Sequence, residues 1–196
     1  MVHRWPMIFG FVLGTTALLL GLHNGSDAIE GWHLAARWTA RVGFPIFILN
    51  YSASALGRLW YNDLTRSIWR DRRWWGLGFV ACHTIHLYAL VTYNRLIHNP
   101  LTFSAVFVGF SAYAVLYVMA ATSNAGAMRA LGRNWKRLHK FGIHWVWLVF
   151  MLTYFGRVFV PASRLDGIAG IAIGLSAMGL RIAAWLKGRN LAPSAA

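Results

Sequence analysis

Residues 74–93 read WWGLGFVACHTIHLYALVTY and contain no Asp, Glu, Lys or Arg. A helix of this length is long enough to cross the hydrocarbon layer of a bilayer, which needs roughly 20 apolar residues. Two imidazoles, those of His83 and His86, lie in the middle of the run. A polar ring at that depth is costly unless it is paired, hydrated or bound to a ligand. The pair is therefore the first candidate for a functional site.

The composition indicates an integral membrane protein. The chain has 196 residues, of which 58% are hydrophobic, and its mean hydropathy is +0.48. It carries 19 Lys and Arg against 5 Asp and Glu, a net charge of +14. In a soluble protein this excess would suggest nucleic acid. Here the basic residues fall between apolar blocks, as the positive-inside rule describes, so we expect membrane lipid around the chain and no nucleic acid partner.

Six apolar blocks have about the length of a membrane span. They are residues 6–22, 38–60, 74–93, 101–122, 138–160 and 168–185. Backbone groups in lipid must be hydrogen-bonded within their own segment, and no alternating barrel pattern is present, so each block is predicted to be a helix. The sequence thus predicts an all-α protein whose residues 1–196 form a single transmembrane domain, a bundle of six membrane-spanning helices.

The basic residues predict the orientation of this bundle. Residues 58–73 contain five arginines, and residues 129–140 contain five Lys and Arg. With the residues near the two termini, fourteen basic residues fall on one side of the predicted bundle and five on the other. The side richer in Lys and Arg is usually cytoplasmic. We therefore expect both termini in the cytoplasm and a multi-pass protein of the bacterial inner membrane.

Histidines on two predicted helices form a candidate metal or haem site. His83 and His86 are three residues apart and share one helix face. His139 and His144 lie near the start of the fifth block, which runs parallel to the third in the predicted topology. Imidazoles from facing helices bind metals and haem in helix bundles, and aromatic residues, 15% of this chain, suit a haem pocket. The alternatives are an interhelical hydrogen bond for His83 or His86 and an interfacial anchor for His139.

Two arginines and four glycines carry further expectations. Arg37 and Arg41 are one helical turn apart, so their side chains point the same way. They could pair with haem propionates, or extend to the outer membrane interface; the sequence leaves both options open. The small-residue pairs Gly10–Gly14 and Gly170–Gly174 predict close contacts between helices of the bundle.

Several motifs resemble the ferric-reductase-like transmembrane domain family, and in pattern most of all its haem-binding membrane subunits of bacterial methionine-sulfoxide reductase systems. Residues 72–79, RRWWGLGF, running on to His86 and Tyr88, resemble its third-helix motif. Residues 131–139, LGRNWKRLH, resemble its entry to the fifth helix, and residues 38–41 and 122–123 also fit. The resemblance covers roughly residues 35–160.

This resemblance implies six helices, b-type haem between the third and fifth helices, and electron transfer across the membrane. By position, His86 matches the third-helix ligand of the haem iron and His139 the first histidine of the fifth helix. The family usually has another fifth-helix histidine, at a position that falls at or near Leu152 here. Because that histidine is missing, His83 and His144 remain alternative ligands.

The sequence thus predicts a haem b electron-transfer subunit that serves a redox partner protein or a quinone. No flavin or nicotinamide motif is present, so the chain is not expected to act as a complete reductase, and no catalytic residues are predicted. The main alternative is a haem-free scaffold or assembly subunit of a larger complex. Paired intramembrane carboxylates and inverted repeats, which would indicate a transporter, are absent. A homo-oligomer is compatible with either reading.

Overall fold

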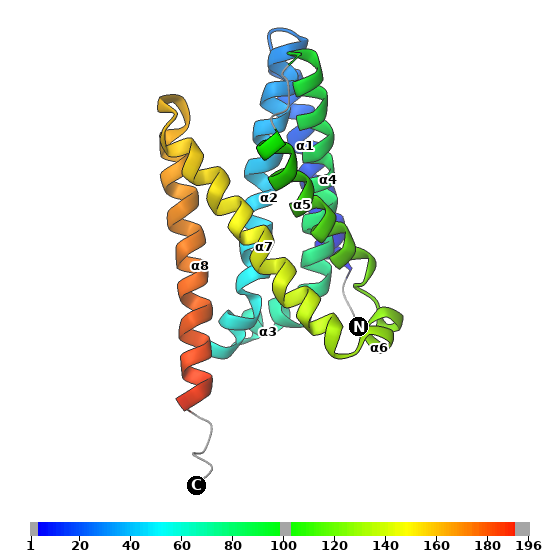
Figure 1. Cartoon of the computed structure of the whole chain (residues 1–196), viewed down its shortest axis with the longest axis vertical. Coiled ribbons are helices and arrows are strands. Elements are labelled where there is room, and N and C mark those ends of the chain that lie inside the picture. Colours follow the sequence, from blue (N-terminus) through cyan, green and yellow to red (C-terminus); the bar gives the residue numbers. More distant parts are fainter. Residues whose placement is uncertain (1–3, 99–102, 191–196) are drawn as a thin grey trace.

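The computed structural model describes residues 4–98 and 103–190 of the chain, and this part is helical without any strand. Figure 1 shows the helices as an elongated bundle crossed obliquely by one long helix, α7. The elements are α1 (Trp5–His23), α2 (Ala28–Leu59), α3 (Asp63–Arg70), α4 (Arg72–Leu96), α5 (Phe103–Ala121), α6 (Ala125–Leu131), α7 (Arg133–Val158), the 3-10 turn η1 (Pro161–Ser163) and α8 (Arg164–Asn190).

The six predicted apolar blocks correspond to the six long helices α1, α2, α4, α5, α7 and α8. Residues 101 and 102 of the fourth block lie outside the described residues. Four helices of the described chain are long and apolar enough to cross a membrane: α1, α4, α7 and α8 together with η1. A fifth span is obtained if α5 and α6, which meet at 103°, count as one bent segment. An all-helical, multi-pass membrane protein is therefore confirmed, while the number six is left as a prediction.

Helix α2 is the main reason why fewer candidate spans are found than the six that the sequence predicts. At 32 residues it is the longest helix of the described chain, but it is not among the spans, and it carries Glu30, Arg37, Arg41 and Arg58. It begins ten residues before the predicted block. Even so, it is central to the packing: it contacts α1, α4 and α8, and its Thr39 and Tyr51 side chains are fully buried.

Two short helices were not predicted. Helix α3 lies within the basic segment at residues 58–73, and α6 overlaps the start of the one at residues 129–140. Asn62 begins α3 with a capping box, in which its side chain accepts from the Thr65 amide and the Thr65 hydroxyl accepts from the Asn62 amide. At the start of α6, the Asn124 side chain accepts a hydrogen bond from the Ala127 amide. Gly132 then adopts a positive φ of 52° between α6 and α7. Both short helices lie toward the end of the bundle where α1 begins and α8 ends (Figure 1).

Small residues bring the helices close together, as their spacing predicts. Gly10 and Gly14 of α1 lie against the backbone of α4 at Gly78 and Cys82, where a Cβ atom on either glycine would be too close. Gly170 and Gly174 of α8 lie in the same way against side chains of α7. The predicted use of both glycine pairs in packing within the bundle is confirmed.

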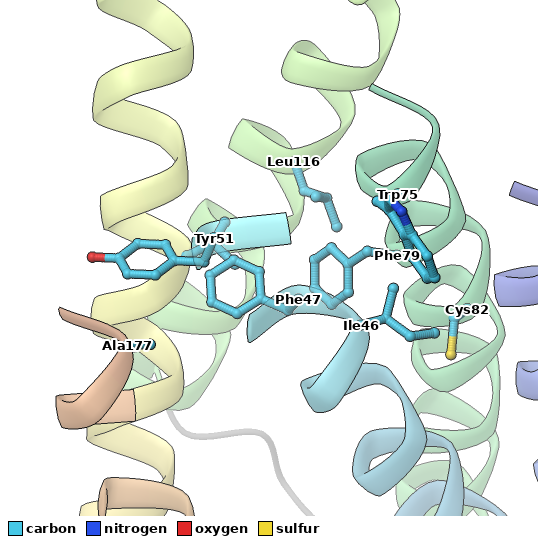
Figure 2. Packing of buried hydrophobic residues seen from close by; sticks show 9 residues of the cluster. Ile46, Phe47, Tyr51, Trp75, Phe79, Cys82, Leu116 and Ala177 are labelled. Carbon is cyan, nitrogen blue, oxygen red and sulfur yellow. The ribbon is translucent and has the colours of Figure 1, made fainter. Parts of the chain in front are cut away.

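An aromatic layer fills the middle of the bundle, as Figure 2 shows for Phe47, Phe79 and their neighbours. The Phe47 and Phe79 rings are 5.2 Å apart, and Phe150 of α7 lies 5.0 Å from Phe47. Ring pairs at these distances add to the stabilisation from burial. Leu116 of α5 and Val146 of α7 are buried in the same layer. Leu116 and Val146 lie between two cavities.

Candidate functional site

The histidine cavity lies between α2, α4, α5 and α7 and has a volume of about 240 Å³. Its walls are mostly apolar, with His83 and His86 contributed by α4 and Arg157 by the last turn of α7. Because both histidines lie on one face of α4, three residues apart, they enter the same cavity, and their ring centroids are 4.9 Å apart. The predicted shared face is confirmed.

His86 is fixed by a hydrogen bond to α2. Its Nδ1 lies 3.1 Å from the hydroxyl oxygen of Thr39, which is fully buried at the contact between α2 and α4. The Ala36 carbonyl is a second neighbour of the ring, which borders the cavity. No side-chain hydrogen bond of the other ring nitrogen, Nε2, is found among residues 4–98 and 103–190. The contact with Thr39 orients the imidazole and leaves one nitrogen available to a ligand.

His83 is held between two aromatic rings. Phe79 stacks on it at 4.8 Å and Tyr113 of α5 at 5.2 Å, and the Tyr113 hydroxyl donates to the His83 carbonyl oxygen over 3.3 Å. Its Nδ1 is buried and lacks a hydrogen-bond partner within the part of the chain that the structure describes. Leaving a buried polar atom unpaired costs about 1–3 kcal/mol, so such an atom needs an explanation.

The basic cavity is larger, about 680 Å³, and opens between the ends of the helices near α3 and α6. Seven cationic side chains line it, and no Asp or Glu does so in the described chain. They are Arg58, Arg70, Arg72, Arg73, Lys136, Lys140 and Arg181. The Asp71 carboxylate accepts hydrogen bonds from Arg70 and thereby raises the pKa of that guanidinium. The surplus positive charge makes this cavity suited to an anionic group.

The two cavities are neighbours. Leu116 and Val146 line both of them. Phe79 lines the basic cavity and stacks on His83, which lines the histidine cavity. The two spaces are therefore one side-chain layer apart.

The structure separates the remaining predicted ligands from the His83–His86 pair. His139 lines the basic cavity, where it stacks on Trp135 at 4.1 Å and its Nε2 lies 3.1 Å from the Thr122 hydroxyl. His144 lies on another face of α7 and lines neither cavity; its Nδ1 is 3.0 Å from the Tyr51 hydroxyl. Thus His83 and His86 are brought together, whereas His139 and His144 each have a separate partner.

Arg37 and Arg41 are engaged by an acid on α8. Arg41 is 2.5 Å from the Asp166 carboxylate and Arg37 is 4.0 Å from it. Neither lines the histidine cavity, but Arg157 does. Its guanidinium carbon also lies 5.6 Å from the Tyr154 ring centroid. The cation that the structure places at the cavity is therefore Arg157, whereas the expectation from the sequence was Arg37 and Arg41.

Sequence reasoning missed three residues of the site. Arg157 lies one turn beyond Thr153 on the fifth predicted helix, a spacing that could have placed it on the cavity face. Thr39 belongs to a motif that was singled out, but nothing in the sequence pairs it with His86. Tyr113 carries no signal, since an aromatic residue in an apolar helix is ordinarily a packing residue.

The donor set fits a haem better than a bare metal ion. No group of three or more His, Cys, Asp or Glu side chains that could hold a metal ion occurs within the described ranges. A porphyrin already supplies most ligands of its iron, so the protein needs to add only axial ones. His86, the unpaired Nδ1 of His83 and the apolar walls provide such a setting, and Arg157 supplies a charge for a carboxylate.

Several curated proteins match the chain, each named protein-methionine-sulfoxide reductase heme-binding subunit MsrQ. The relative from Xanthomonas axonopodis pv. citri is 35% identical over 146 residues, which is 64% of either chain. The relative from Bordetella pertussis is 27% identical over 130 residues, and that from Cronobacter sakazakii 28% over 152 residues. The chain is similar to the MsrQ subunits. This agrees with the resemblance to the haem-binding subunits of methionine-sulfoxide reductase systems.

The extent of these matches is limited. The matched part covers 64% of the Xanthomonas axonopodis relative and 62% of the Bordetella pertussis relative, but 70% of the Cronobacter sakazakii relative. No protein-family model matches the chain, so the wider ferric-reductase-like family has no support beyond the motifs. No solved structure matches it either.

Proposed function

We propose that this chain is a haem-binding membrane subunit that passes electrons to a partner redox protein. The observation that carries the proposal is the pair of imidazoles, His83 and His86, in one apolar cavity, with one nitrogen unpaired and another without a side-chain hydrogen bond in the described chain. The name shared by the similar MsrQ subunits, heme-binding, supports the same cofactor.

In this proposal the histidine cavity holds one b-type haem. His86 would hold the haem iron, as the third-helix motif implies, and His83 lies beside it in the stacked aromatic wall. Arg157 would supply a positive charge for a haem carboxylate, in place of Arg37 and Arg41, which Asp166 engages. The haem supplies one-electron redox chemistry, while the protein sets its ligand, burial and neighbouring charge.

We place the basic cavity on the cytoplasmic side, where electrons enter from a donor such as a quinone or a reductase. Its cations come largely from the two basic segments that the positive-inside rule assigns to that side. Phe79 and His83 then connect the donor side with the haem. The proposal retains six membrane spans, with α2 and the bent α5 among them, both termini in the cytoplasm and a location in the bacterial inner membrane. By analogy with the names of the relatives, the acceptor is a protein-methionine-sulfoxide reductase.

An absorption spectrum of the purified protein, expressed with added haem precursor, tests the proposal. We expect a Soret band that shifts on reduction. His86→Ala should abolish most of the bound haem, whereas His23→Gln should not, because His23 is exposed at the end of α1. A folded wild-type protein without a Soret band, or a His86→Ala variant with a full haem content, would contradict the assignment.

One observation favours the haem-free scaffold as the second candidate. The residues of α7 that face the histidine cavity include Val149 and Thr153, neither of which provides an imidazole opposite His86. His139 and His144, in turn, already have hydrogen-bond partners. If the scaffold is correct, the wild-type protein will fold and assemble with its partners without haem. Replacement of His86 will then leave assembly unchanged.

A further inference from the structure

We infer that Thr39 is a positioning residue for His86: its hydroxyl oxygen accepts a hydrogen bond from Nδ1–H and thereby keeps the lone pair of the imidazole on Nε2, at the cavity. The inference deepens the proposed function and rests on His86 being the haem ligand. Thr39 stands on α2 and His86 on α4, so the contact ties the ligand to a second helix.

The direction of this hydrogen bond follows from counting protons. The Thr39 hydroxyl oxygen lies 2.7 Å from the Ala35 carbonyl oxygen and 3.1 Å from the Ala36 carbonyl oxygen. Carbonyl oxygens can only accept, so the single hydroxyl proton is directed at them. What remains on the hydroxyl is lone-pair density, and this faces Nδ1 of His86 at 3.1 Å. Nδ1 must therefore be the donor. If the hydroxyl donated to Nδ1 instead, no proton would lie between the oxygens of Thr39 and Ala35, which are only 2.7 Å apart.

A neutral imidazole carries one proton, so a protonated Nδ1 leaves Nε2 with its lone pair. The histidine nitrogen that binds a metal needs that lone pair, and the other nitrogen of such a histidine usually donates to a second group. Thr39 fills that second position. It is fully buried among small residues of α2, where water cannot replace it as an acceptor.

The same contact is expected to affect the haem itself. A hydrogen bond donated by Nδ1–H makes the imidazole a stronger electron donor to its metal. Electron donation stabilises ferric more than ferrous iron, and hence Thr39 should lower the reduction potential of the bound haem.

The first experiment does not depend on haem. The protein is labelled with ¹⁵N-histidine and purified without the cofactor, and His86 signals are identified by their absence in a His86→Gln spectrum. We expect the Nδ1–H form of His86 in the wild type and a shift toward the Nε2–H form in Thr39→Val. A wild-type His86 in the Nε2–H form would overturn the inference, whatever the outcome for haem binding.

The second experiment compares haem-loaded variants. Thr39→Val should weaken haem affinity by roughly 10- to 100-fold, as loss of such a second group commonly does, and should raise the reduction potential. Thr39→Ser keeps the hydroxyl and should restore most of both properties. Thr92→Val is the control: Thr92 makes the same bond to a carbonyl one turn earlier in its helix, to Tyr88 over 2.9 Å, and lies outside the lining of the histidine cavity.

The outcomes separate the two claims. A wild-type protein without haem contradicts the proposed function, and the tautomer measurement still decides the role of Thr39. If the wild type binds haem but Thr39→Val matches it in affinity and potential, Thr39 has no positioning role while the haem site stands. Equal losses in Thr39→Val and Thr39→Ser would point to packing alone and would also overturn the inference.

Discussion

The three arginines Arg37, Arg41 and Arg157 differ in their neighbours. These neighbours decide which of them can serve the histidine cavity. All three come from the side of the predicted bundle with few basic residues. The Asp166 carboxylate engages Arg37 and Arg41 at the start of α8. Arg157 instead borders the histidine cavity. At the residue scale, these neighbours predict different consequences for haem binding.

Arg157→Gln should weaken haem binding, because it removes a positive charge from the cavity that is proposed to hold the haem carboxylates. A hydrogen bond to a charged group contributes about 1.5–3 kcal/mol, which corresponds to a loss of roughly 10- to 150-fold in affinity. Haem titration of the purified variant, followed at the Soret band, measures this loss.

Arg41→Gln is the control for this prediction. It breaks a partly exposed ion pair, which is worth about 0–1 kcal/mol, and should leave haem affinity within a few-fold of the wild type. The reverse result, with Arg41→Gln weaker than Arg157→Gln, would return the propionate role to Arg41.

For single residues, the sequence predicted which side chains share a face of one helix, but it missed the side-chain contacts between two helices. The shared face of His83 and His86 follows from their spacing alone. The partners Thr39 of His86 and Tyr51 of His144 come from α2, at separations of 47 and 93 residues in the chain. Such contacts depend on the register between helices, which no local pattern in this chain encodes.

At the scale of elements, the rotation of α7 about its axis decides which of its residues can face His86. His139, Ile143 and Val146 line the basic cavity, and Val146, Val149 and Thr153 line the histidine cavity. Leu152, the approximate place of the missing histidine, is 52% exposed and lines neither cavity. The cavity-lining positions around it are Val149, Phe150, Thr153 and Tyr154, and of these Val149 and Thr153 are not aromatic.

Val149→His should supply the imidazole that α7 lacks at the histidine cavity. We expect haem affinity to rise by roughly tenfold or more, which requires only about 1.4 kcal/mol, and the ferric spectrum to become that of a low-spin haem. Without haem, the same variant should unfold more readily, because a buried and unpaired polar group costs about 1–3 kcal/mol. Absorption spectra and thermal unfolding, each with and without haem, measure both effects.

Leu152→His provides the comparison for Val149→His. It introduces the same side chain three residues further along α7, at a 52% exposed position that lines neither cavity, so its haem affinity and spectrum should match the wild type. A low-spin spectrum in Leu152→His but not in Val149→His would show that α7 is rotated differently from this structure.

Helix positions were predictable to the extent that apolar runs define them. The block at residues 74–93 and helix α4 differ by only two or three residues at each end. For α2 the predicted start was wrong by ten residues, because Trp32, His33 and Arg37 precede the continuous apolar run although the helix is already packed against α1 there. Helices α3 and α6 were missed because they are only eight and seven residues long and lie between the apolar blocks, although Asn62 and Asn124 are recognisable cap residues.

At the scale of the whole molecule, charge and cavities are arranged along one axis. The cations of the two basic segments gather around the basic cavity near α3 and α6, and the histidine cavity follows beyond the layer of Leu116 and Val146. Under the proposed function, electrons would pass along this order, from the basic cavity to the haem. Both cavities are lined by residues of α4 and α7, which are candidate spans, whereas α2 is not among the spans.

Cysteine labelling can determine the topology because the natural Cys82 is fully buried and should not react. We would introduce cysteines singly at Asn24 and Ala162, for the predicted outer side, and at Leu64 and Ala130, for the cytoplasmic side. All four positions are exposed. A membrane-impermeant maleimide should label the first pair in intact spheroplasts and the second pair only after lysis.

The unsubstituted chain, with Cys82 alone, is the control and should remain unlabelled in both conditions. Asn24 and Leu64 lie at opposite ends of α2, so they decide the disputed span directly. Labelling of both from the same side would mean that α2 does not cross the membrane. The positive-inside assignment would then fail for residues 58–73. This basic segment and the α1–α2 connection, which are predicted on opposite sides, would lie on the same side of the membrane.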